Sequence, residues 1–296
     1  MKNTLDTCCK NSLKGVFFLF SKRLIKSGKL DIMKLLILFY FLRDCTDEIK
    51  IENEKFLEEK RGKMYRVILI DADDTLFDYE KSERHAMRKV FEDFGFFERN
   101  SEEKYFSIKE EYKKINSFLW SELEKGNITS KNLRVERFKQ LFDKVGLEYD
   151  AEKFSQGYLD RLGEGTYLFD GAVELCKYMK SKYKVAIVTN GIKEVQHSRI
   201  ENSKISEYID EIIVSEEVGV SKPNPKIFEY AIKKLGCENL DKNEIIMIGD
   251  SQTADIKGGI NFGIDTCWVN LLGKDENLEI KAKYKVDKLS ELYEII

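Results

Sequence analysis

The stretch Val67-Ile-Leu-Ile-Asp71-Ala-Asp73-Asp-Thr75 joins a short apolar run directly to three carboxylates and a hydroxyl. Its β-branched apolar residues predict a buried strand. Similar runs occur at Val185–Val188 and Ile245–Ile248, with a weaker one at Ile212–Val214, and helical stretches separate them. Strands that alternate with helices predict an α/β fold, in which a parallel sheet carries helices on both faces.

The pattern between the first and second predicted strands is helical only. Apolar residues recur there at steps of three and four, as one face of a helix requires: Val135, Phe138, Leu141 and Val145. We therefore predict a helical cap over residues 79–165. It is inserted into a core that is formed by residues 64–78 and 166–296.

Polar side chains follow each predicted strand at the point where it ends. Because the carboxyl ends of parallel strands meet at one edge of a sheet, we expect these side chains to lie together. In chain order the residues at these positions are Asp71, Asp73 and Thr75, then Thr189, Asn190 and the backbone of Gly191, then Lys222, then Asp250 and Asp255.

This combination of groups suits phosphoryl transfer. A carboxylate can attack phosphorus and form an aspartyl-phosphate. Mg²⁺ prefers oxygen ligands and usually takes one or two carboxylates together with substrate phosphate. A transferring phosphoryl group also needs a cation and donors held in place. The two prolines of the chain, Pro223 and Pro225, directly follow Lys222 and restrict the backbone, so we expect this loop to orient the lysine.

Composition excludes several other classes. The chain of 296 residues has 50 Lys and Arg against 53 Asp and Glu, so its net charge of −3 gives no reason to expect a nucleic-acid polymer as partner. Only two histidines occur, which disfavours a histidine-rich metal site or a Ser-His-Asp triad. Six cysteines without a CxxC pair indicate free thiols in a reducing compartment, and we predict a cytoplasmic protein.

Residues 1–63 differ from the rest, because the first 43 carry nine basic and two acidic side chains. The apolar run Leu35–Leu42 is much shorter than the about 20 residues that span a bilayer, so we predict no stable membrane association. An amphipathic segment at a membrane surface is one interpretation. We favour another: codons for Glu58–Lys63 are almost all purines and resemble a translated ribosome-binding site, so that the native protein begins at Met64.

Asp71-x-Asp73-x-Thr75, Thr189, Lys222 and Gly249-Asp250-x4-Asp255, in this order, resemble the motifs of the haloacid dehalogenase (HAD) superfamily of phosphatases. The resemblance implies a Rossmann-like parallel sheet core, the HAD fold, with an inserted helical cap. It implies that Asp71 is the nucleophile, that Asp73 is the general acid and base, and that Thr189 and Lys222 hold the phosphoryl oxygens. The implied magnesium ligands are Asp71, the backbone carbonyl of Asp73, and Asp250, with Asp255 in support.

A narrower resemblance concerns substrate. Trp120 followed by Gly126-Asn-Ile-Thr129, and Ser215-Glu-Glu-Val-Gly-Val-Ser-Lys-Pro-Asn-Pro225, are similar to the pyrimidine 5′-nucleotidase subfamily. This similarity implies a small-molecule partner, a pyrimidine nucleoside 5′-monophosphate. We expect four further residues to contact it: Thr75, Asn190, Gly191 and Trp120.

Three alternatives stay open. Another small phosphomonoester, such as phosphoglycolate or a sugar phosphate, would use the same core residues. Haloacid dehalogenation is disfavoured, because Asp73 offers a proton that a departing halide does not need. A phospho-accepting receiver domain carries a similar Asp, Thr and Lys, but it lacks a large helical insert after its first strand.

Overall fold

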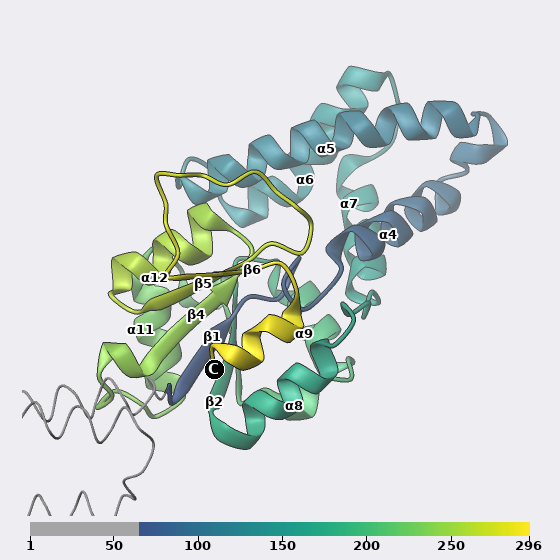
Figure 1. The fold of residues 1–296 in the computed structure, drawn as a ribbon. Helices are drawn as coiled ribbons and strands as arrows, with labels where there is room; N and C mark the ends of the chain where they lie inside the picture. The colour runs from purple at the N-terminus through teal and green to yellow at the C-terminus, as the bar shows by residue number, and fades with distance from the viewer. Residues whose placement is uncertain (1–64) are drawn as a thin grey trace, which may run out of the picture. The chain divides into compact units, whose positions relative to one another are not determined.

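A computed structural model describes residues 65–296 of the chain. Six parallel strands form one sheet in the order β3-β2-β1-β4-β5-β6 (Figure 1). Their bounds are β1 Val67–Ile70, β2 Lys184–Thr189, β3 Glu211–Val214, β4 Ile245–Gly249, β5 Asp265–Val269 and β6 Tyr284–Val286. The α/β fold class and the four strands expected from the apolar runs are confirmed.

The sheet is buried on both faces, which is why its central strands are apolar at every position. Along β1, Ile68 and Ile70 face one hydrophobic cluster, whereas Val67 and Leu69 face another. Helix α8 (Ala172–Lys182) packs into the first cluster and α11 (Pro225–Lys234) into the second. The remaining core helices are α9 (Lys193–Glu201), α10 (Ser215–Val218) and α12 (Lys257–Phe262).

Four helices are inserted between β1 and α8: α4 (Tyr79–Asp93), α5 (Glu102–Glu124), α6 (Ser130–Val145) and α7 (Ala151–Gly163). Each begins where a side-chain oxygen accepts a bond from a backbone amide of the first turn; these N-cap residues are Asp78, Ser101, Thr129 and Asp150. The helices bury a hydrophobic cluster of their own, rich in aromatic rings. Figure 1 shows them beyond the end of the sheet at which β1 finishes.

The structure contains two strands that the sequence pattern does not reveal. Strand β5 begins with Asp265 and Thr266, and β6 has only three residues, so neither gives an apolar run long enough to stand out. The helix expected over Ala254–Asn261 is also different. A π-helical turn at Gln252–Ile256 precedes α12, so Asp255 lies in this turn and not in the regular helix.

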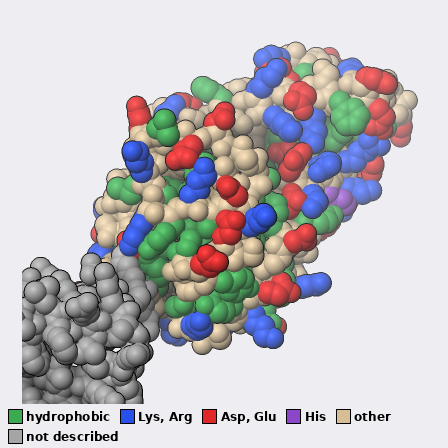
Figure 2. Space-filling view, viewed as in Figure 1, with side chains coloured by type: hydrophobic (Ala, Val, Ile, Leu, Met, Phe, Trp, Pro, Cys, Tyr) green, Lys and Arg blue, Asp and Glu red, His purple; other side chains and the backbone are tan. Residues whose placement is uncertain are grey.

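The distribution of surface charge and the state of the cysteines can be compared with what the composition led us to expect. On the face seen in Figure 2, basic and acidic side chains are interspersed over the described residues. Cys176 and Cys267 are buried, Cys237 is partly buried, and all three are free. Within residues 65–296, no helix is both long and apolar enough to cross a bilayer. Both interpretations of residues 1–63 fall outside the part of the chain that the structure describes.

Candidate active site

The strand ends open into a cavity of about 530 Å³, which also contacts the inserted helices. Nine of the ten predicted site residues line it, and they come from four strand ends and from α5: Asp71, Asp73, Trp120, Thr189, Asn190, Gly191, Lys222, Asp250 and Asp255. The tenth, Thr75, lies outside this wall. It is fully buried, and its hydroxyl lies 3.5 Å from Oδ1 of Asp250.

Lys222 is the centre of the site. Its ammonium donates to Oδ1 of Asp71 over 2.5 Å and to the carbonyl oxygen of Val188 over 2.6 Å, and it lies 2.7 Å from Oδ1 of Asp255. The side chain is 2% exposed, so its charge is compensated almost entirely by the protein. Because the ammonium joins three segments that are far apart in sequence, it fixes the position of Asp71 in the pocket.

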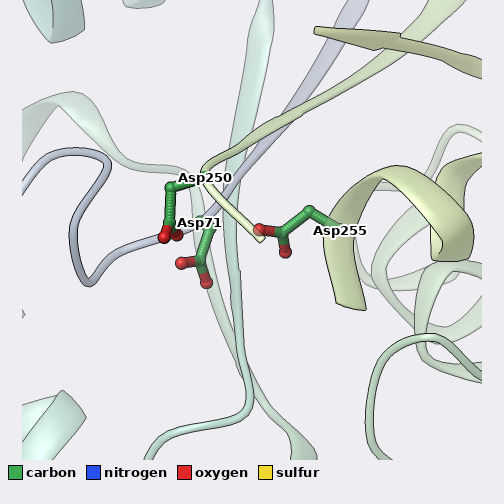
Figure 3. A group of neighbouring side chains, drawn as sticks. All are labelled: Asp71, Asp250 and Asp255. Atoms are coloured by element: carbon green, nitrogen blue, oxygen red, sulfur yellow. The ribbon is translucent and has the colours of Figure 1, made fainter. Parts of the chain in front are cut away.

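Three carboxylates converge beside this lysine. Asp71, Asp250 and Asp255 each present an oxygen, and these oxygens lie within 4.8 Å of one another. Figure 3 shows Asp71 and Asp250 at neighbouring strand ends, with the Asp255 carboxylate directed toward them from the turn before α12. Asp255 is fully buried, and its Oδ2 accepts a bond of 2.9 Å from the Ser251 amide.

Burial decides the protonation behaviour of this group. Desolvation and the neighbouring Asp255 together raise the pKa of Asp71 to about 7, despite the opposing charge of Lys222. The pKa of Asp250 also rises to about 7 through burial, although Lys274 opposes the rise. Burial alone would lower the pKa of Lys222, but Asp255 and Asp71 outweigh it, so the net shift is upward.

The donor set fits a divalent cation. Hard carboxylate oxygens that are held close together in a buried site repel one another, and a cation removes that repulsion. Lys274 provides partial compensation on the open side, where its ammonium lies 2.5 Å from Oδ2 of Asp250 and 3.5 Å from Oδ2 of Asp74. Neither Lys274 nor Asp74 was among the predicted site residues.

The loop after β2 supports Lys222 as well as the pocket. Asn190 uses both groups of its amide on the backbone of Lys222: Oδ1 accepts from the amide over 2.8 Å, and Nδ2 donates to the carbonyl over 2.9 Å. The hydroxyl of Thr189 accepts from the Gly191 amide over 3.0 Å. Gly191 passes so close to Gln196 that a Cβ atom would collide with its side chain. The direct contact of Asn190 and Gly191 with substrate stays a prediction.

Asp73 points to a different set of partners from Asp71. Its Oδ1 accepts a short bond from the guanidinium of Arg199, and its Oδ2 accepts a bond of 2.6 Å from Nε2 of Gln196. Arg199 is fully buried and also donates over 2.8 Å to the carbonyl oxygen of Gly165, at the junction between the inserted helices and the core. Asp73 is therefore tied to the segment that connects the two parts.

Sequence reasoning missed Gln196 and Arg199. They lie three residues apart on α9, so they share one face of that helix, and α9 directly follows the Thr189 loop. That spacing was a usable signal, because a helix that starts at a strand end presents its first turns to the site. Trp120, by contrast, was expected in the pocket and does line it.

A family comparison agrees with this geometry. Residues 68–269 match the model of the haloacid dehalogenase-like hydrolases, and the match includes every predicted core motif. The chain is a haloacid dehalogenase-like hydrolase. The HAD assignment made from the motifs is thereby confirmed.

The chain is also similar to individual members of this family. The HAD-hydrolase YfnB of Bacillus subtilis is 37% identical over 234 residues, which cover 79% of this chain and 96% of YfnB. The pyrimidine 5′-nucleotidase YjjG of Escherichia coli is 32% identical and covers 77% of this HAD chain and 96% of YjjG. The pyrimidine 5′-nucleotidase PynA of Streptococcus pneumoniae is 29% identical over 78% of this chain and 95% of PynA.

The crystal structure of one relative contains a metal ion. The crystal structure of YfnB bound to magnesium matches this HAD hydrolase with a TM-score of 0.71 and 36% identity, over 78% of this chain and 98% of that one. A relative with the same fold thus holds the ion that the buried carboxylates of this site fit.

Proposed function

We propose that this HAD hydrolase is a Mg²⁺-dependent phosphomonoesterase that hydrolyses pyrimidine nucleoside 5′-monophosphates through an aspartyl-phosphate. The observation that carries the proposal is the Lys222 ammonium, which is buried between Asp71 and Asp255 at the edge of a cavity that can hold a nucleotide. The similarity to YjjG and PynA supports the choice of substrate.

In the first half-reaction, a carboxylate oxygen of Asp71 attacks phosphorus, and the bond to the 5′-oxygen breaks. Lys222 and Thr189 hold the phosphoryl oxygens as negative charge spreads over them. Asp73, which enters this step as the carboxylic acid, gives its proton to the departing 5′-oxygen, which would otherwise leave as a strongly basic alkoxide. Arg199 and Gln196 hold the Asp73 side chain in the pocket wall until the substrate arrives.

In the second half-reaction, Asp73 takes a proton from a water molecule, and the resulting hydroxide attacks the phosphorus on Asp71. Inorganic phosphate leaves, and the Asp71 carboxylate is regenerated. Mg²⁺, held by Asp71, the Asp73 carbonyl and Asp250, with Asp255 behind them, would neutralise phosphate charge throughout. The backbone of Lys222, held by Asn190, keeps the ammonium in place in both steps.

We also propose separate roles for the two parts of the chain. Residues 64–78 and 166–296 form the catalytic core, and residues 79–165 form the cap that selects the leaving group. In support, the inserted helices bury a hydrophobic cluster distinct from the two that cover the sheet. Trp120 on α5 lines the cavity, and we propose that it stacks on the base.

A phosphatase screen with Mg²⁺ tests the proposal. The panel includes UMP, dUMP, dTMP, AMP, GMP, phosphoglycolate, a sugar phosphate and a 2-haloacid. We expect kcat/KM to be highest for the uracil and thymine nucleotides. Equal or better efficiency on purine nucleotides, or on phosphoglycolate, would refute the substrate assignment while it leaves the phosphatase assignment intact. Halide release without phosphate release would refute both.

A further inference from the structure

The wall of the cavity formed by the inserted helices contains a buried arginine. Arg137 on α6 lines the cavity, yet its side chain is fully buried. Its Nη1 donates to the Tyr112 hydroxyl over 3.3 Å and to Oδ1 of Asn116 over 3.4 Å, and its Nε donates to the Arg134 carbonyl over 3.3 Å. All three acceptors are neutral.

The Arg137 guanidinium lies near two aromatic rings, with its Cζ 4.8 Å from the Tyr158 centroid and 5.0 Å from the Phe138 centroid, but it lacks an anionic partner among the described residues. Its Nη2 forms no hydrogen bond, and none of the carboxylates in residues 65–296 forms an ion pair with it. Burial lowers the pKa of Arg137, but the surrounding Tyr112, Tyr158 and Tyr79 together with Glu83 raise it, and the net shift is upward. A buried charge with an unused donor costs free energy, and such groups persist where a ligand completes them.

Asn116 adds a second donor at the same place. An arginine has no acceptor, so the amide oxygen of Asn116 must face Arg137, which leaves its NH₂ group for a ligand. Asn116 and Arg137 line the same cavity as Trp120 and Tyr79. Hydroxyl contacts of 3.3 and 3.4 Å extend the network from Tyr112 through Tyr158 to Tyr79 and hold it rigidly.

We propose that Arg137 and Asn116 select the base, by donating hydrogen bonds to the 4-oxo group of a uracil or thymine ring. This inference rests on the proposed function. With its phosphate at Asp71 and Lys222, a nucleotide directs its base toward the cap. The 4-oxo group is the ring acceptor farthest from the ribose. Cytosine and adenine carry an amino group at the corresponding edge, and this group would place donor against donor.

The test combines enzyme variants with matched substrates. We measure kcat/KM for UMP and for CMP in the wild type, in Arg137→Met, which removes the donors at similar length, and in Arg137→Lys. The wild type should prefer UMP by about tenfold or more, the discrimination expected from one donor pair at a base edge. Arg137→Met should bring the ratio close to one, and Arg137→Lys should restore part of it.

Arg134→Met is the matched control. Arg134 lies three residues earlier on the same helix, but it pairs with Glu216 and lies outside the cavity wall. We expect it to leave the UMP-to-CMP ratio unchanged, whatever it does to stability. If Arg137→Met does not fold, the wild type is tested on the 5′-monophosphate of pyrimidin-2-one riboside, which lacks the 4-oxo group and the N3 proton. A loss of about tenfold against UMP supports the proposal.

The results distinguish a failure of the proposed role of Arg137 from a failure of the proposed function. A wild type that prefers pyrimidine nucleotides, but whose UMP-to-CMP ratio stays within twofold in Arg137→Met, overturns the role of Arg137 and leaves the proposed function standing. Equal cleavage of UMP and the pyrimidin-2-one nucleotide by the wild type does the same. A wild type that cleaves purine nucleotides as well as UMP refutes the proposed function itself, and the base-selection proposal with it.

Discussion

Asp71 and Asp73 are two residues apart, yet they serve different parts of the site. Asp71 accepts a hydrogen bond from Lys222 at the strand ends, whereas Asp73 accepts hydrogen bonds from Arg199 and Gln196 on α9. The order of motifs predicted that the carboxylates, Thr189 and Lys222 would meet. It could not predict Arg199 as a partner of Asp73, because 126 positions separate them and only the packing of α9 brings them together.

Replacing Asp71 with asparagine should abolish turnover. The amide is a poor nucleophile and a weaker magnesium ligand. Removing the carboxylate therefore loses a large part of the roughly 8–23 kcal/mol by which enzymes lower the activation free energy. We expect a loss of several orders of magnitude in kcat with UMP and Mg²⁺. Circular dichroism should show a folded protein, because the fully buried apolar core is untouched. Residual activity within a hundredfold of wild type would remove Asp71 as the nucleophile.

Metal-free protein should lose stability as pH rises. The pKa values of Asp71 and Asp250, raised to about 7, mean that the folded state binds more protons than the unfolded state between about pH 4 and pH 7. The free energy of unfolding therefore decreases with rising pH in that window. In EDTA, Tm should fall between pH 5 and pH 8, and Mg²⁺ should reverse the fall. Asp250→Asn should flatten the profile; an unchanged slope would contradict this account.

At the scale of elements, the end of β4 and the turn after it place two carboxylates. Gly249 ends the strand, and the π-helical turn brings Asp255 back against it. A Cβ atom at Gly249 would collide with the Asp255 carboxylate, so this strand can approach the turn only with glycine at that position. The apolar run predicted β4, but this close packing is a tertiary contact and has no counterpart in the periodicity.

Gly249→Ala should therefore disrupt the site more than the fold. The new methyl group pushes Asp255 toward Lys222 and Asp71, and we expect kcat/KM to fall at least about tenfold, since small misplacements of reacting groups have large effects. Gly157→Ala is the control. It lies on α7 away from the site, where a Cβ would meet only the Val90 side chain at 3.3 Å. Equal activity in both variants would contradict the packing argument.

The sequence predicted elements well where their pattern is local. The four apolar strands follow from short β-branched runs, and the inserted helices follow from apolar residues at steps of three and four, such as Phe138 and Leu141 on α6. Strands β5 and β6 were not predicted, because pairing with their neighbouring strands stabilises them more than their own composition does. Thr75 lies outside the cavity wall, with its hydroxyl near Asp250. This position depends on the fold of the loop after β1, so no sequence pattern could predict it.

The whole molecule places a helical layer over the edge of the sheet, and polar contacts join the two parts. Arg134 and Ser130 on α6 both bond Glu216 on α10, and the Thr253 hydroxyl donates over 3.0 Å to Glu124 on α5. Glu124 and Thr253 line the cavity, whereas the contacts of Glu216 lie outside its wall, and both sets join an inserted helix to the core. Under the proposed function, the core supplies the chemistry and the inserted helices select the substrate.

The central claim is a two-step reaction through a phosphate on Asp71, and Asp73→Asn tests it most directly. With para-nitrophenyl phosphate and Mg²⁺, the first step needs little protonation because the phenolate is a good leaving group, whereas the second step needs the missing base. Rapid mixing should show a burst of about one equivalent of nitrophenolate per active site, followed by very slow turnover. Rapid quench and peptide mapping should recover the phosphate on Asp71. Steady turnover without a burst, and no phosphorylated peptide, would contradict the account.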